Sequence, residues 1–172
     1  SQIEPLLSGG TGSVSHTEEV PSFLPDRFEP GTPNIPGILG LHAALCDLEQ
    51  TDMDKLHQHE LELTQYFING LMQMDPSEST LRAIGKHNTI ERTSVVSVQT
   101  LQTDMARVAY EMDDTYGIMT RVGLLCAPSA HKTLGTYPEG TIRFSFGPEN
   151  THHEVDLALH ALAEITGSPY HL

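Results

Sequence analysis

Two side chains in the last third of the sequence have the chemistry of a site that handles sulfur. Cys126 lies in a stretch interrupted by glycine and proline, so we expect its thiol on an accessible loop. A thiol that acts as a nucleophile needs access and nearby positive charge, which Arg121, His131 and Lys132 can supply. Arg143 follows in a short alternating segment, and an arginine fork is well suited to bind a carboxylate. Together they predict sulfur chemistry on a small substrate that carries a carboxylate.

Each candidate residue also has a structural interpretation. Cys126 could be a buried small hydrophobe, and Arg143 could be a solvated charge on a strand. Gly31 and Thr32 could form a turn before a helix, although a helix N-terminus with a threonine hydroxyl can also hold a phosphate. On spacing alone the turn is favoured there. The second cysteine, Cys46, lies in an apolar stretch, and we interpret it as structural.

The charge balance argues against several classes of partner. The 172 residues include 9 basic and 23 acidic residues, a formal charge of −14. We therefore expect no binding to nucleic acid or to an anionic membrane surface. Two cysteines are too few for a disulfide framework, so we expect a reducing, cytoplasmic setting. No apolar run approaches the ~20 residues of a membrane span, and no histidine or cysteine pair has metal-ligand spacing, so we predict no bound metal.

The elements that position these residues are predicted from apolar spacing and capping signals. Residues 1–37 are rich in proline and glycine and predict irregular structure. Four helices are predicted, and the first begins at Pro36. The second begins after Thr51 or Asp52 and ends at Asp75, and the third begins after the cap Thr103 and ends at Gly117. The fourth begins at a capping box of Thr151 and Glu154 and ends at Gly167. Four strands are predicted at residues 80–84, 94–99, 118–121 and 141–146, with Cys126 on the loop 122–140.

This order of elements predicts an α+β domain, a small antiparallel sheet with helices on one face. In the last strand, Ile142 and Phe144 alternate with Arg143, so Arg143 is expected on the face opposite the core. The candidate substrate anchor then lies on the polar face of the sheet, and the candidate thiol lies on the loop that leads into the same strand.

Five blocks of the sequence point in one direction. They are Gly9-Gly-Thr-Gly-Ser13, Pro25-Asp-Arg-Phe-Glu-Pro-Gly-Thr-Pro-Asn34, Gly123-Leu-Leu-Cys-Ala-Pro-Ser-Ala-His-Lys-Thr-Leu-Gly-Thr136, Gly140-Thr-Ile-Arg-Phe-Ser-Phe146 and Asn150-Thr-His-His-Glu-Val-Asp156. In this order they resemble the C-terminal half of a cysteine desulfurase or selenocysteine lyase-like protein of the class V aminotransferase family. The resemblance covers nearly the whole chain. It implies that residues 52–172 form the small C-terminal domain of a fold type I pyridoxal-phosphate enzyme, and that residues 1–51 are the end of the large domain and its connecting helix, with a poorly ordered N-terminal part.

The resemblance also implies a role for each candidate residue. Cys126 matches the nucleophile that takes the sulfur of L-cysteine as a persulfide and releases L-alanine. Arg143 matches the arginine that binds the substrate α-carboxylate. Gly31 and Thr32 match the pair that contacts the phosphate of the partner subunit's pyridoxal phosphate. The expected assembly is a cytoplasmic homodimer, with a sulfur-acceptor protein as a further partner.

Two departures from the family pattern qualify this reading. The lysine that forms the Schiff base in the family is absent from this sequence. Lys132 resembles the motif of that lysine only superficially, because it lies in the loop 122–140 that carries Cys126. The intact enzyme is therefore expected to be active and this chain alone inactive. Leu125 stands before the cysteine where many relatives have histidine. The alternatives are a selenocysteine lyase acting on L-selenocysteine, another class V enzyme, and a non-catalytic acidic α+β interaction module in which Cys126 is buried.

Overall fold

The chain divides into two compact units. The computed structural model describes residues 3–14 and 16–169, and the units are Ser1–Thr51 and Asp52–Leu172. Among its described residues the first unit contains one helix, α1 (Ile35–Gln50), which starts where the side chain of Asn34 accepts a hydrogen bond from the amide of Gly37 at 3.1 Å. Every residue of α1 is described, and none is buried. Cys46 is half-buried on this helix, and its structural role stays a prediction.

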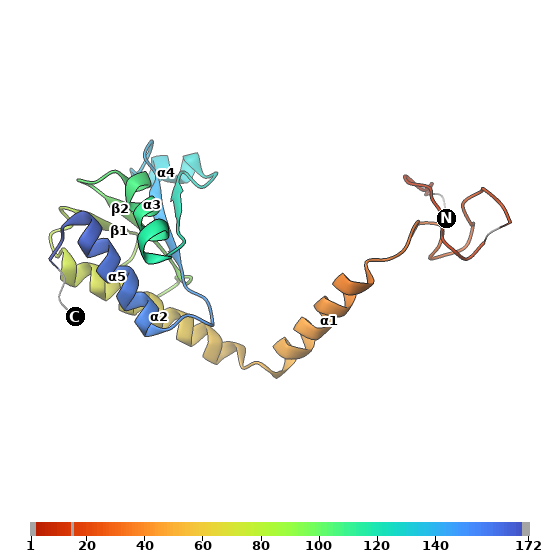
Figure 1. Ribbon diagram of the computed structural model, residues 1–172, viewed down its shortest axis with the longest axis horizontal. Helices are drawn as coiled ribbons and strands as arrows, with labels where there is room; N and C mark the ends of the chain where they lie inside the picture. Colours follow the sequence, from red (N-terminus) through yellow and green to blue (C-terminus); the bar gives the residue numbers. More distant parts are fainter. Residues whose placement is uncertain (1–2, 15, 170–172) are drawn as a thin grey trace. The chain divides into compact units, whose positions relative to one another are not determined.

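The second unit holds the remaining elements around a four-stranded sheet (Figure 1). Its helices are α2 (Met53–Met74), α3 (Met105–Tyr116), α4 (Pro128–Leu134) and α5 (His152–Thr166). Its strands are β1 (Leu81–Ile84), β2 (Val95–Thr100), β3 (Arg121–Gly123) and β4 (Thr141–Ser145). The strands are antiparallel in the order β1-β2-β4-β3. The predicted α+β class is confirmed.

Local signals explain most of the helix boundaries. Asp52 caps α2, and Thr151 with Glu154 forms the predicted capping box at the start of α5. Gly117 and Gly167 end α3 and α5 in the left-handed conformation that glycine adopts without strain. At the end of α2 the carboxylate of Asp75 accepts hydrogen bonds from the amides that open β1, so a single side chain links helix and strand.

Three sequence predictions need correction. The N-cap of α3 is Asp104 rather than Thr103, because the Asp104 carboxylate accepts the amide of Arg107 at 2.8 Å. The third strand covers Arg121–Gly123 instead of residues 118–121, since only these residues pair with β4. The segment 122–140 is not a plain loop, because the helix α4 lies inside it.

The core lies on one face of the sheet. Buried residues of α2, α3 and α5 pack against inward-facing residues of the strands, including Val96, Val98 and Ile142. The ring of Phe67 on α2 is 4.7 Å from that of Phe144 and 5.3 Å from that of Phe146, measured between centroids. This apolar layer fixes the position of β4, and therefore of the polar side chains on the other face of the same strand.

Candidate functional site

Two glycines close the loop that carries Cys126. Gly123 ends β3 and pairs with Thr141, the first residue of β4. Gly140 has a φ of +83°, and a Cβ built on it would lie 2.3 Å from the carbonyl carbon of Gly123. Real Cβ atoms do not approach backbone so closely, so only glycine fits at position 140. The two ends of the loop therefore lie close together, next to the paired strands β3 and β4.

Cys126 lies at the corner of a tight turn. The amide of Ala127 donates to the carbonyl of Leu124 at 2.8 Å, and the central residues Leu125 and Cys126 have φ values of 50° and 61°. Positive φ at both central positions is the pattern of a type I′ turn. Each L-residue in this conformation costs about 1–2 kcal/mol. The turn leaves Cys126 exposed, so the alternative with a buried Cys126 is wrong.

The rest of the loop is braced internally. Nδ1 of His131 and Oγ1 of Thr136 are 2.7 Å apart, and both residues are buried. The ammonium of Lys132 lies 5.1 Å from the ring centroid of Tyr137, a cation–π distance. His131 and Lys132 thus have partners within the loop, and the structure does not aim them at Cys126 as the sequence led us to expect. What they supply is a rigid support for the turn.

Arg143 projects from the polar face at the centre of the sheet. It is half-buried, and its cross-strand neighbours are Ser97 on β2 and Arg121 on β3. Within the described part of the chain, its Nε is buried and has no hydrogen-bond partner. A guanidinium held in this way is suited to a carboxylate, because it offers parallel donors and a fixed charge.

Arg121 was predicted only as a charge near the thiol, yet it lies directly opposite Arg143 in the β3–β4 pair. Two arginines at paired positions on one face make a stronger anion site than either alone. The alternation around Arg143 was visible in the sequence, but the pairing was not, because it depends on the strand order and register. Arg121 is thus the residue of this site that the sequence prediction missed.

Gly31 and Thr32 belong to the first unit, and each is exposed. Gly31 has a φ of +89°, and its amide donates to the carbonyl of Gly10 at 2.7 Å. That amide is therefore already used, and Gly31 contributes its backbone conformation rather than a donor. Thr32 is exposed just before α1, and nothing lies within 4 Å of a Cβ built on Gly31. The turn leaves Thr32 accessible, and its role in holding a phosphate stays a prediction.

The described part of the chain has neither a metal-ligand cluster nor a helix that could span a membrane. No group of three or more histidine, cysteine, aspartate or glutamate residues gathers there as metal ligands would. None of the helices described is long and apolar enough to cross a membrane.

The sequence model of the family described as Aminotransferase class-V matches residues 1–158. The chain therefore belongs to the class-V aminotransferase family. A probable cysteine desulfurase of Pyrococcus abyssi is 34% identical over 169 residues, which cover 96% of this chain and 40% of the relative. A probable cysteine desulfurase of Staphylococcus epidermidis is 32% identical over 164 residues, which cover 94% of this chain and 38% of the relative. The chain thus spans about two fifths of the length of these relatives.

Solved structures agree with these relatives. The apo structure of a cysteine desulfurase from Thermococcus onnurineus NA1 is similar with a TM-score of 0.71 and 29% identity, over 95% of this chain and 38% of that chain. A cysteine desulfurase from Escherichia coli is similar with a TM-score of 0.69 and 26% identity, over 94% of this chain and 38% of that chain. The predicted resemblance to cysteine desulfurases is confirmed.

Proposed function

We propose that this chain supplies the sulfur-accepting thiol and the carboxylate-binding arginines of a pyridoxal-phosphate-dependent cysteine desulfurase. The observation that carries the proposal is the exposed Cys126 on a braced, strained turn, in the loop that leads into the strand of Arg143. An inert cysteine needs neither exposure nor strain, whereas strained backbone is concentrated at functional sites. The relatives named above are cysteine desulfurases, which supports the same reaction.

Arg143 and Arg121 bind the α-carboxylate of L-cysteine in this proposal. They are paired across β3 and β4 on the polar face. In a chain with a formal charge of −14, such a pair gives a local positive field that attracts a small anion. Binding at the carboxylate orients the rest of the substrate, so its sulfur can be presented to the thiol of Cys126.

The role of Cys126 is to accept sulfur. Its thiolate attacks the sulfur of the substrate, a sulfur–sulfur bond forms, and the bond between that sulfur and Cβ of the substrate breaks. The electron pair of the broken bond stays with the carbon, which takes up a proton, so the product is L-alanine and Cys126 carries a persulfide. A sulfur acceptor then takes the outer sulfur and restores the thiol.

Pyridoxal phosphate, when bound, supplies the electron sink that makes the carbon–sulfur bond breakable. This chain's contribution to holding it is Thr32, whose exposed position on the turn formed by Gly31 fits a phosphate oxygen. We assign this phosphate to the cofactor of the partner subunit in a cytoplasmic homodimer. The unit Asp52–Leu172 is then the small domain, and Ser1–Thr51 is the end of the large domain with its connecting helix. On this basis the chain alone is inactive.

The test begins with the 172-residue chain. Iodoacetamide should label Cys126 in the native state, with Cys126→Ala as the blank and Cys46→Ala as the matched control that retains the label. In the intact enzyme, Cys126→Ser should abolish persulfide formation and L-alanine release from L-cysteine, while Cys46→Ala keeps both. Protection of Cys126 until the chain is denatured, or full sulfur transfer by Cys126→Ser, would overturn the proposal. The same assay with L-selenocysteine separates a desulfurase from a selenocysteine lyase.

A further inference from the structure

A buried glutamine on strand β2 contacts the end of the loop that carries Cys126. Gln99 is 7% exposed, and its Nε2 donates a hydrogen bond to the carbonyl of Gly140 at 3.3 Å. Gly140 is the last residue of the loop and directly precedes β4. On the other side of the same amide group, Oε1 of Gln99 accepts a hydrogen bond from Nη2 of Arg82 on β1. Gln99 therefore connects strand β1 to the end of the loop.

The two neighbours of Gln99 need opposite chemistry from one side chain. An arginine only donates hydrogen bonds, and a backbone carbonyl only accepts them. The side-chain amide of glutamine carries both an acceptor and a donor, so it satisfies Arg82 and Gly140 at once. A glutamate at this position would keep the acceptor and lose the donor, and a leucine would lose both. The link between strand and loop therefore depends on the amide itself.

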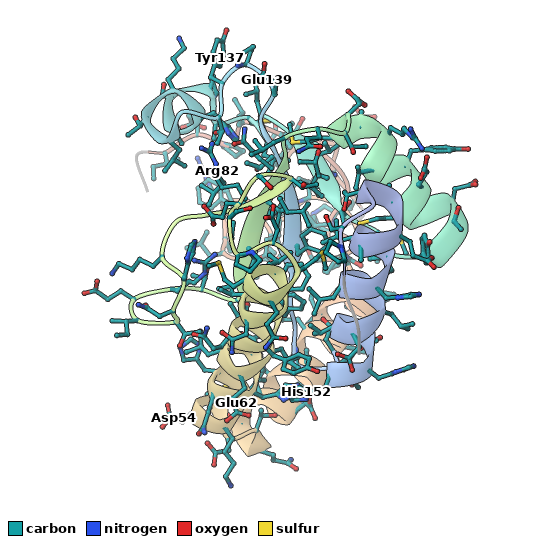
Figure 2. The ribbon with its side chains drawn as sticks, turned by 90° about the vertical axis from the view of Figure 1, so that its left-hand side faces the viewer. Asp54, Glu62, Arg82, Tyr137, Glu139 and His152 are labelled. Carbon is teal, nitrogen blue, oxygen red and sulfur yellow. The ribbon has the colours of Figure 1, made fainter. Side chains whose placement is uncertain are left out.

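Arg82 sets the orientation of that amide. Figure 2 shows Arg82 at the end of the unit that carries Tyr137 and Glu139 of the loop, while Asp54 lies at the opposite end. Among the described residues no carboxylate forms an ion pair with Arg82. Its hydrogen bond goes to Oε1 of Gln99 instead, and this leaves Nε2 directed at the loop.

Gly140 passes this contact on to helix α4. The amide of Gly140 donates to the carbonyl of Thr136 at 2.7 Å, and the amide of Thr136 donates to the carbonyl of His131 at 2.9 Å. The side chains of Thr136 and His131 are also bonded, and both residues are buried. Gly140 has little freedom to shift, because its Cβ position lies 2.3 Å from the carbonyl carbon of Gly123. The end of the loop and the helix inside it are therefore held together.

The same series of hydrogen bonds reaches the turn at Cys126. The amide of His131 donates to the carbonyl of Ala127 at 3.2 Å. The amide of Ala127 in turn donates to the carbonyl of Leu124 at 2.8 Å, which closes the turn. Printed along the chain of contacts, every step from the side chain on β1 to this turn is a hydrogen bond.

We propose that Gln99 is a positioning residue for sulfur transfer, whose amide, oriented by Arg82, fixes the end of the loop and with it the turn of Cys126. The proposal rests on the sulfur-accepting role given to Cys126 above. Gln99 acts through Gly140 and not on the thiol itself. The positive φ values at Leu125 and Cys126 are strained, and such strain persists only where the surroundings impose it. Loss of the amide should let the turn relax and leave the carboxylate-binding arginines in place.

Gln99→Leu in the 172-residue chain tests the support of the loop. Hydrogen exchange of the Gly140 and Thr136 amides should become about tenfold faster, while exchange of the Phe144 amide inside β4 should not change. The rate at which iodoacetamide labels native Cys126 should change as well. Gln102→Leu is the matched control, because Nε2 of Gln102 also donates to a backbone carbonyl, that of Ser79 at 3.1 Å. It should alter neither measurement.

Steady-state kinetics of the intact enzyme separate positioning from a purely structural role. Gln99→Leu should lower kcat for L-alanine release from L-cysteine about tenfold and change KM by less than about twofold, because Arg143 and Arg121 are untouched. Gln99→Glu keeps the acceptor for Arg82 but has no donor for Gly140. It should therefore speed exchange at Gly140 as Gln99→Leu does, and it covers the case in which Gln99→Leu does not fold.

The outcomes distinguish this proposal from the proposed function. Wild-type exchange at Gly140 in both variants of Gln99, or a Gln99→Leu enzyme with wild-type kcat, overturns the positioning role. A rise in KM without a fall in kcat overturns it too, since the change would then act on substrate binding. Full sulfur transfer by Cys126→Ser in the same assay is a failure of the proposed function instead, whatever Gln99→Leu does.

Discussion

The two faces of strand β4 differ in whether their buried atoms have partners within the described structure. On one face, Ile142 and Phe144 are buried in a layer of apolar side chains from α2, α3 and α5. On the other, Arg143 and Thr141 have buried polar atoms without partners in the described structure. One strand of five residues therefore carries an apolar core face and a polar face with two buried atoms that have no partner among the described residues. The difference indicates that stability and ligand binding depend on alternate residues of the same strand, and so can be changed separately.

The largest effect is expected from the core face. Phe144→Ala removes a ring that is 4% exposed and packs on Phe67, so it should lower the free energy of unfolding by about 3–5 kcal/mol. Arg143→Gln, one residue away, should change it by less than about 1 kcal/mol, because it removes no core contact. Urea unfolding of both variants measures the contrast. Binding of butyrate, a simple monocarboxylate probe, should be lost only in Arg143→Gln. Equal destabilisation by the two changes would show that the two faces do not contribute separately.

The second-largest loss of unfolding free energy is expected where Gly140 closes the loop that carries Cys126. Gly140→Ala forces a positive φ on alanine and places its Cβ against the backbone of Gly123, for an expected loss of about 2–4 kcal/mol. Gly135→Ala is the matched control. Gly135 also has a positive φ, but nothing lies within 4 Å of its Cβ position, so only about 1–2 kcal/mol should be lost.

Labelling separates closure of the loop from general stability. If the glycine contact positions the loop, Gly140→Ala should also change the rate at which iodoacetamide labels native Cys126, while Gly135→Ala should not. Equal unfolding free energies for the two variants would show that the approach of Gly140 to Gly123 does not restrain the loop.

Asp75 tests a contribution from the junction of helix α2 and strand β1. Burial raises the pKa of its carboxyl, but hydrogen bonds from the amides of Leu81 and Thr80 and from the Ser77 hydroxyl outweigh burial and hold the pKa well below its usual range. Asp75→Asn should therefore lower the free energy of unfolding by about 2 kcal/mol at pH 7.

The pH dependence follows from the direction of that shift. A carboxyl whose folded-state pKa is depressed stabilises the fold above its unfolded pKa, near 4, and loses this effect as the pH falls toward the folded-state pKa. The gap between wild type and Asp75→Asn should be constant from about pH 5 to 8 and should narrow below about pH 4. A gap that widens in acid would mean that the carboxylate is not the stabilising form.

Sequence patterns were reliable where a short-range cause sets the structure. The capping box at Thr151, the cap at Asp52 and the alternation around Arg143 each depend on residues a few positions apart, and each is present. Helix α4 was missed because its seven residues, which begin with Pro128, are too few to show a helical period. Arg121 was not assigned to the carboxylate site, because its place opposite Arg143 depends on strand order and register, which local patterns do not encode.

The turn at Cys126 could not be predicted from local patterns either. A substitution in this turn is expected to give the smallest change in the free energy of unfolding. Leucine and cysteine are poor residues for positive φ, so only the closure of the loop around them can impose this conformation. Asparagine tolerates the left-handed region, and Leu125→Asn should therefore raise the free energy of unfolding by about 0.5–1 kcal/mol. Leu134→Asn makes the same change in helix α4 and should give no gain. If Leu125→Asn is instead destabilising, the half-buried leucine side chain matters more than backbone strain, and the turn is held by packing.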